Sequence, residues 1–196
     1  MLVDLAFPVQ GPAVPADHRA LLAAALAERL PWLGVLPGTG MHRLNLAHGG
    51  SGLLSGRTRL TLRVPDDRAD VAAQQLSGVE LALGGVTLRL GAPTLRPLLP
   101  HRTLYAHFVD AEGDDEPAFL ARMDRELQAL GVACSTVCGR EQALPVPGGQ
   151  LVGYSLLLDG LVPDTALRVL EAGLGAHRAM GCGLFVPHKS AAAVGA

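Results

Sequence analysis

The predicted strands and helices of this chain follow the same order twice, and this repetition constrains the fold more than any other feature. Short apolar or alternating runs predict strands, and longer runs with apolar residues on one face predict helices. The first set comprises residues 2–7, 18–30, 41–46, 57–63, 66–76 and 79–90. The second set comprises residues 103–109, 116–130, 132–137, 151–158, 163–173 and 184–187. Each set reads strand, helix, strand, strand, helix, strand.

This order is typical of the ferredoxin-like arrangement, an antiparallel sheet with helices on one face. The sequence therefore predicts an α+β protein of two tandem ferredoxin-like βαββαβ units. We expect an N-terminal unit at residues 1–92 and a C-terminal unit at 101–190, joined by a Pro-rich segment at 93–100. The face of each sheet that carries no helix is available for binding.

Composition sets the broad class of the protein. A length of 196 residues with 49% hydrophobic and 17% charged residues fits a folded protein with one or two cores. The longest apolar run, residues 20–27, is far shorter than the roughly 20 residues that cross a bilayer. Residues 1–4 do not resemble a signal peptide, and three cysteines cannot close a disulfide framework. We expect a cytoplasmic protein with reduced thiols and no membrane partner.

The net charge of −2 hides a segregation of charge along the chain. Residues 29–65 contain five arginines and two histidines without an Asp or Glu, and residues 81–109 contain three more arginines and two histidines, again without an acid. Carboxylates concentrate at residues 110–126. The cations are almost all arginine, which suits bidentate contacts with phosphate and stacking on bases. GC-rich coding would also favour Arg over Lys, but it does not explain the missing acids.

A glycine-rich loop follows the last predicted helix. Residues 173–183 read Gly-Leu-Gly-Ala-His-Arg-Ala-Met-Gly-Cys-Gly and lead directly into the final strand. Glycine permits positive φ and the close approach of a bulky partner, and His177 and Arg178 could meet phosphate oxygens. The alternative interpretation is an ordinary loop after a helix that ends at Gly173.

The candidates for chemistry are histidines and arginines. His42 and His48 follow the first helix, and either could transfer a proton near neutral pH. The chain lacks the nucleophile elbow, the phosphate loop and the dinucleotide fingerprint. Cys134 and Cys138 would need two further ligands to form a metal site. We therefore expect neither a metal nor a small-molecule cofactor.

Several segments together resemble one family. They are Val3-Asp-Leu-Ala-Phe-Pro-Val9, Leu30-Pro-Trp-Leu33, Gly40-Met-His-Arg43, Arg57-Thr-Arg-Leu60, Leu95-Arg-Pro97, Gly173-Leu-Gly175 and Met180-Gly-Cys-Gly-Leu-Phe-Val-Pro187. These segments are similar to those of the Myxan-type CRISPR-associated Cas-six endoribonucleases of the RAMP superfamily. The resemblance covers nearly the whole chain, and the C-terminal loop is its most specific part.

The resemblance implies two RRM-related units that cut CRISPR repeat RNA into mature crRNA. In this family cutting needs no metal, and a ribose 2′-hydroxyl attacks the adjacent phosphate, leaving a 2′,3′-cyclic phosphate. The family's catalytic histidine follows the first helix, a position matched here by His42, with His48 in reserve. Other members place a lysine or tyrosine beside the histidine, but the single lysine here is Lys189. Arg57 is expected to stabilise charge, since arginine is a poor proton donor.

The expected partners are the repeat RNA and its crRNA product, with other Cas subunits of an effector complex such as Cascade as further candidates. Phosphate contacts and the shape of a repeat hairpin should dominate recognition. The residues expected to bind RNA are Arg43, Arg57, Arg59, Arg96, Arg102, Gly173, Gly175, His177, Arg178, Gly181, Gly183 and Lys189.

Two other interpretations stay open at this point. A crRNA-binding subunit of an effector complex would share the fold and the loop but would not cut RNA. A ferredoxin-like scaffold or metabolite sensor would bind RNA weakly and without salt dependence, because only phosphate contacts impose a steep salt slope.

Overall fold

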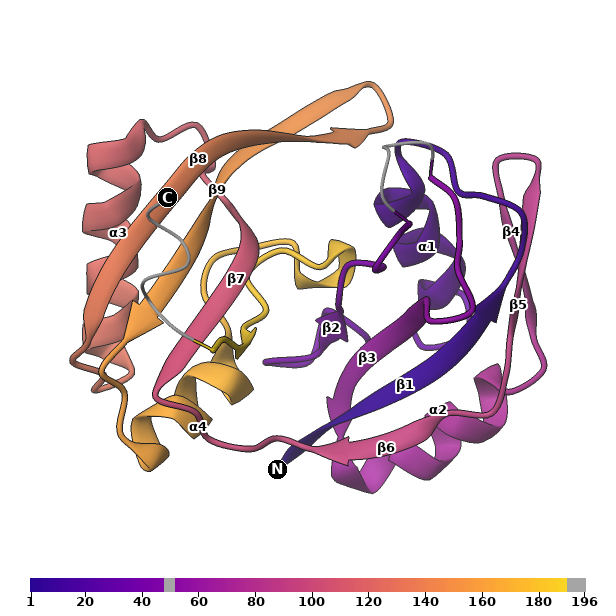
Figure 1. The fold of residues 1–196 in the computed structure, drawn as a ribbon, viewed down its shortest axis with the longest axis horizontal. Helices are drawn as coiled ribbons and strands as arrows, with labels where there is room; N and C mark the ends of the chain where they lie inside the picture. Colours follow the sequence, from indigo (N-terminus) through magenta and orange to yellow (C-terminus); the bar gives the residue numbers. More distant parts are fainter. Residues whose placement is uncertain (48–51, 190–196) are drawn as a thin grey trace.

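The computed structural model of the chain describes residues 1–47 and 52–189. The N-terminal half contains β1 (Leu2–Gln10), α1 (His18–Ala27), β2 (Gly40–Met41), β3 (Arg59–Pro65), the 3₁₀ turn η1 (Asp66–Arg68), α2 (Ala69–Leu76), β4 (Glu80–Leu83), β5 (Val86–Leu90) and β6 (Thr94–Pro97). The C-terminal half contains β7 (Thr103–Asp110), α3 (Glu116–Ala129), β8 (Ser135–Val146), β9 (Gly149–Asp159), α4 (Pro163–Ala172), the 3₁₀ turn η2 (Arg178–Met180) and β10 (Val186–Pro187). Figure 1 shows the two halves side by side, with the segment that contains η2 between them.

The first sheet is antiparallel and centred on β1. Its order is β2-β3-β1-β5-β4, and β6 also pairs with β1. One end of β1 pairs with β6, from Val3 to Ala6, while the other end pairs with β5 at Val9 and Gln10. The long strand β1 therefore pairs with β6 and then with β5 along the same edge.

The alternation of side chains along β1 decides what each face of this sheet does. Val3, Leu5, Phe7 and Val9 are buried in the core that the sheet forms with α1 and α2. Asp4 lies between them in the sequence and so points to the opposite face, because successive strand residues point to opposite sides. On β3, the buried Leu60, Leu62 and Val64 face the same core, whereas Arg59, Thr61 and Arg63 share the face of Asp4.

The second sheet repeats this plan with the order β10-β7-β9-β8. Its first strand lies next to its third and fourth strands, as β1 lies next to β3 and to β5 and β6. A separate core that includes Leu104, Phe119, Leu156 and Val169 fills the space between this sheet and its helices α3 and α4. The predicted α+β architecture of two antiparallel sheets is thus confirmed.

Three strands differ most from the sequence-based expectation. The strand expected at 41–46 is reduced to β2, because residues after Met41 do not continue the ladder with β3. Part of the expected Pro-rich joint forms β6, whose pairing with β1 overrides its poor strand composition. The strand expected at 132–137 starts later and runs to Val146, because it forms a long hairpin with β9.

Two arginines of the N-terminal half bind backbone carbonyls of the C-terminal half. Arg63, with 1% of its surface exposed, donates through Nη1 to Leu170 O at 2.9 Å and to Phe185 O at 3.1 Å. Arg19 donates to Met180 O at 2.7 Å and to Gly181 O at 2.6 Å. These contacts fix the relative position of the halves.

Among the described residues, no helix combines the length and apolar character needed to cross a membrane.

Candidate active site

A cavity of about 560 Å³ lies between the two halves. The first sheet and the segment after β2 contribute Asp4, His42, Arg43, Asn45, Arg57, Arg59, Thr61 and Arg96, and the C-terminal half contributes His107, Gly181, Leu184, Val186 and Pro187. Most of its ionisable side chains are cationic or basic. The cavity can therefore hold an anionic group next to two imidazoles.

His42 follows β2 directly and is held by the backbone. Its N–H donates to Thr61 O on β3 at 2.8 Å, so its place is set by the last ladder contact of β2 with β3. The side chain is only 13% exposed, and Nε2 lies 3.5 Å from Asp4 Oδ1. That nitrogen is buried and makes no hydrogen bond with the described residues, although the carboxylate is within ion-pair distance. Burial lowers the pKa of His42, and the Asp4 carboxylate opposes this shift.

Asp4 connects His42 to the buried Arg63. The Arg63 guanidinium donates from Nε to Asp4 Oδ1 and from Nη2 to Asp4 Oδ2, each at 2.9 Å. Burial alone would raise the pKa of Asp4, but the contacts with His42 and Arg63 outweigh it and hold this pKa well below its ordinary value. Asp4 therefore stays ionised beside the histidine. Asp4 was not among the predicted site residues, since its partner Arg63 lies 59 positions away.

Four predicted arginines of the two acid-free stretches come together. Arg43, Arg57, Arg59 and Arg96 all line the cavity with His42. Arg59 lies at the start of β3, Arg57 precedes the strand, and Arg96 lies on β6, opposite Asp4 in the pairing with β1. Arg59 also donates to the carbonyls of Gly56 and Thr58, each at 2.9 Å, so part of its guanidinium is already used.

The C-terminal half brings a second histidine, His107, to this cavity. Its ring packs edge-on against Tyr105, with centroids 4.7 Å apart, and Tyr105 also contacts the His188 ring at 5.4 Å. Burial, then Arg43, Arg19, His42 and His188, lowers the pKa of His107 to about 4. His107 was not among the predicted site residues, although the absence of acids from residues 81–109 was an available signal.

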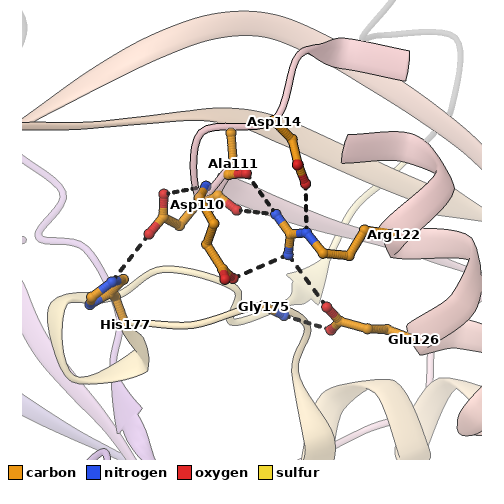
Figure 2. A network of polar contacts seen from close by, with 8 residues as sticks. Asp110, Ala111, Asp114, Arg122, Glu126, Gly175 and His177 are labelled. Carbon is orange, nitrogen blue, oxygen red and sulfur yellow. Dashed lines mark hydrogen bonds and ion pairs between the residues drawn. The ribbon is translucent and has the colours of Figure 1, made fainter. Parts of the chain in front are cut away.

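The glycine-rich loop is held from behind by a polar network centred on Arg122 of α3 (Figure 2). Arg122 contacts Asp114 at 2.9 Å, Glu112 at 3.2 Å and Glu126 at 3.5 Å. Glu126 Oε2 accepts the backbone N–H of Gly175 at 2.8 Å. His177, whose φ is 61°, places Nε2 3.2 Å from Oδ2 of the buried Asp110. The acidic stretch near residue 110 thus supports the loop.

The loop also packs against the N-terminal half, which bears on several predicted RNA contacts. Gly181 lines the cavity, while Gly173 and Gly183 are buried. The Arg178 side chain lies against Gly173, and its Nε is buried with no hydrogen-bond partner among the described residues. The structure gives Gly173 and Gly183 a packing role, and their contact with RNA stays a prediction.

The remaining predicted residues lie outside the cavity or outside the described part. Arg102 precedes β7 with its side chain 78% exposed, and its Nε is 4.0 Å from Asp159 Oδ1. Lys189 is exposed just beyond β10. His48, the reserve catalytic candidate, lies outside the described residues. Within residues 1–47 and 52–189, no group of three or more His, Cys, Asp or Glu side chains could hold a metal ion.

Comparisons with known proteins show the family of this chain. The family model described as Cas6 Crispr matches residues 3–190. Over 202 residues the chain is 41% identical to the CRISPR-associated endonuclease Cas6 of Myxococcus xanthus strain DK1622, covering 99% of this chain and 85% of that protein.

Solved structures share the fold at low sequence identity. A Cas6-related protein of Pyrococcus furiosus superposes with a TM-score of 0.69 at 13% identity, covering 95% of this chain and 98% of its own. Thermus thermophilus Cse3 bound to an RNA representing a pre-cleavage complex gives 0.52 at 17% identity, covering 94% and 98%. At these identities the likeness shows the common arrangement of two sheets.

Proposed function

This chain belongs to the Cas6 family of CRISPR-associated proteins, and we propose that it is an endoribonuclease that cuts CRISPR repeat RNA into mature crRNA. The Myxococcus relative carries the name of an endonuclease, and it shares two fifths of its aligned residues with this chain. The observation that carries the proposal is His42 in a cavity lined by four arginines between the two halves.

The proposed reaction is an internal transfer that needs no metal ion. A repeat 2′-hydroxyl attacks the adjacent phosphorus atom, and the 5′-oxygen of the next nucleotide leaves. The products are a 2′,3′-cyclic phosphate and a 5′-hydroxyl. This chemistry needs a group that accepts a proton, a group that donates one, and cations beside the phosphate oxygens. His42 transfers a proton in this scheme.

The arginines supply the positive charge. Arg57 and Arg96 are exposed side chains at the cavity, and we propose that they meet the scissile phosphate or its neighbours. Arginine remains protonated at neutral pH, which suits it to stabilise the charge that grows on phosphate oxygens during attack. Arg43 adds a further cation directly after His42.

The expected ligand is a repeat hairpin whose phosphates follow the arginine-lined cavity. We propose that the two sheets act as the two units of this binding surface, and that Arg102 and Lys189, which are exposed at the start of β7 and the end of β10, extend it. Continued binding of the cut hairpin, inside a complex with other Cas subunits, is an extension of the same proposal.

Cleavage of end-labelled repeat RNA from the neighbouring CRISPR array tests this function. In EDTA, the wild-type protein should make a single cut that leaves a cyclic phosphate. His42→Ala should slow that cut by about 100-fold or more, because proton transfer contributes this much, while RNA affinity is retained. The exposed His101, outside the cavity, offers a matched control, and His101→Ala should cut at the wild-type rate.

Two outcomes would change the conclusion. Tight binding by the wild-type protein without any cut would indicate a crRNA-binding subunit. Undiminished cutting by His42→Ala would move the role to His48, for which His48→Ala is the direct test.

A further inference from the structure

The wall of the cavity opposite the first sheet carries its own imidazole. His107 lies on β7 of the second sheet, whereas His42 lies at the end of β2 in the first. Both line the same cavity of about 560 Å³. The edge-on contact with Tyr105 limits the orientations of the His107 ring. A phosphate in this cavity would therefore have a histidine on each side.

The two histidines stand in different electrostatic surroundings. His107 faces cationic or basic groups from several elements: Arg43 after β2, Arg19 on α1, His42, and His188 after β10. Together with burial, they lower the pKa of His107 to about 4, so its imidazole is neutral at pH 7 and can accept a proton. Burial and Arg63 also lower the pKa of His42, but the Asp4 carboxylate 3.5 Å from Nε2 opposes this shift. A carboxylate beside one histidine and cations around the other suit the first to act as the acid and the second as the base.

We propose that His107 and His42 form the proton-transfer pair of the cleavage reaction, with His107 as the base and His42 as the acid. This inference rests on the proposed function. His107 takes the proton of the attacking 2′-hydroxyl as the bond between O2′ and phosphorus forms. The bond between phosphorus and O5′ then breaks, and His42, as an imidazolium beside Asp4, gives its proton to O5′. Exchange with water returns both histidines to their starting states.

Other described side chains at the cavity do not fit the role of base. The guanidinium groups of its four arginines offer no acceptor atom, and Asp4 is bound at both oxygens by Arg63. Asn45 and Thr61 do not titrate near neutrality. The negative charge of a bound phosphate would also raise the pKa of both histidines, which moves His107 toward a more effective base and favours the protonated form of His42.

A substrate with a modified leaving group separates the two roles. We would measure single-turnover cleavage of the repeat RNA and of the same RNA with sulfur in place of the 5′-oxygen that leaves. A thiolate leaves without protonation, so this substrate no longer needs the acid. His107→Gln should slow both substrates by about 100-fold or more. His42→Gln should slow the normal RNA to a similar extent but cut the sulfur-containing RNA within a few fold of wild type.

The controls separate this inference from the proposed function. His101→Gln should match wild type on both substrates, since His101 lies outside the cavity. Melting temperature and RNA affinity of His107→Gln establish that the variant folds and binds. If it folds and cuts both substrates at the wild-type rate, His107 is not the base, yet the endoribonuclease function stands. If the wild-type protein cuts neither RNA, the proposed function itself fails.

The wild-type enzyme gives a test that needs no variant at His107. A base and an acid with separate pKa values produce a bell-shaped dependence of the single-turnover rate on pH. A profile with only one ionisation would overturn the pair. Rescue of His107→Gln, but not of His42→Gln, by the sulfur-containing RNA would also overturn the assignment, because the two roles would then be exchanged.

Discussion

At the scale of single residues, Asp4 joins the proposed catalytic histidine to a buried guanidinium. Arg63 holds both carboxylate oxygens and uses its remaining Nη1 donor on carbonyls of the other half. The carboxylate can therefore rotate little, and Oδ1 stays 3.5 Å from Nε2 of His42. Asp4 acts in this arrangement as a positioning residue, because it reaches the reaction only through His42.

Asp4→Asn should change the pH dependence of cleavage. The carboxylate raises the proton affinity of His42, so its loss should lower the pKa of that histidine further. An acid works below its pKa, and the decline in rate at high pH should therefore begin at a lower pH. The pH profile of single-turnover cleavage measures this shift, and Asp4→Glu should restore it in part. An unmoved alkaline limb in a folded Asp4→Asn protein would show that Asp4 does not tune His42.

The site residues predicted from the sequence lie close together in the chain, whereas those that were not predicted are brought to the site by folding. His42 and the arginines between 43 and 59 were predicted because they lie close together in an acid-free stretch. The partners of Arg63 lie 59, 107 and 122 positions away, so only the folded chain brings them into contact. His107 belongs to the same class, since its role depends on a cavity wall that the second sheet provides.

At the scale of elements, the loop at residues 173–183 owes its glycines to packing. At Gly181, where φ is 78°, an added Cβ would lie 2.8 Å from Met41 O and 3.0 Å from Arg19 Nη2. At Gly183, where φ is 67°, an added Cβ would clash with Leu174 O. A bulky residue at Gly181 would therefore disturb the contact between the halves before it met any RNA. Within this loop, Gly181 packs against the N-terminal half and forms part of the cavity wall.

Gly183→Ala should destabilise the protein far more than Gly148→Ala. Both glycines have positive φ, at 67° and 82°, so each substitution bears a backbone cost of about 1–2 kcal/mol. The space around Gly148 is open, whereas Gly183 meets backbone, so its replacement should cost about 2 kcal/mol more. Chemical denaturation of the two variants measures this difference. Equal losses of stability would mean that the loop at residues 173–183 can shift to accept a side chain.

The helices were predicted more accurately than the strands. The expected helix at 116–130 corresponds to α3, whose N-cap Asp115 accepts the N–H of Ala118 at 3.0 Å, a local signal in the sequence. The residues at which a strand begins and ends depend instead on the strands with which it pairs. β6 forms from a segment rich in proline because β1 offers a free edge, and β8 extends because β9 runs beside it. Such pairings are set by tertiary structure, which a local pattern cannot encode.

At the scale of the whole molecule, basic and acidic residues that are separated along the sequence are also separated in space. The arginines of residues 43–59 and Arg96 meet at the cavity, while acidic residues 110–126 include the network around Arg122 on the other side of the loop (Figure 2). The net charge of −2 therefore says little about the surface that RNA would approach. The positions of the arginines, rather than the net charge of the protein, should govern RNA binding.

The salt dependence of RNA binding tests this argument directly. Each phosphate contact that releases counterions adds about 0.7 to the slope of log affinity against log salt for a single strand, and about 0.9 for a duplex. The double variant Arg57→Gln/Arg96→Gln removes two arginines from the cavity, so the slope should become shallower by roughly 1.4–1.8. Affinity should be titrated with repeat RNA from low to moderate salt.

A second double variant removes the same net charge elsewhere. Arg68, on η1, and Arg125, on α3, are exposed and do not line the cavity. Arg68→Gln/Arg125→Gln should therefore leave the slope close to that of wild type. If both double variants reduce the slope equally, RNA responds to the overall charge of the protein. If only the cavity variant does, the arginines that the fold gathers beside His42 are the ones that hold the phosphates.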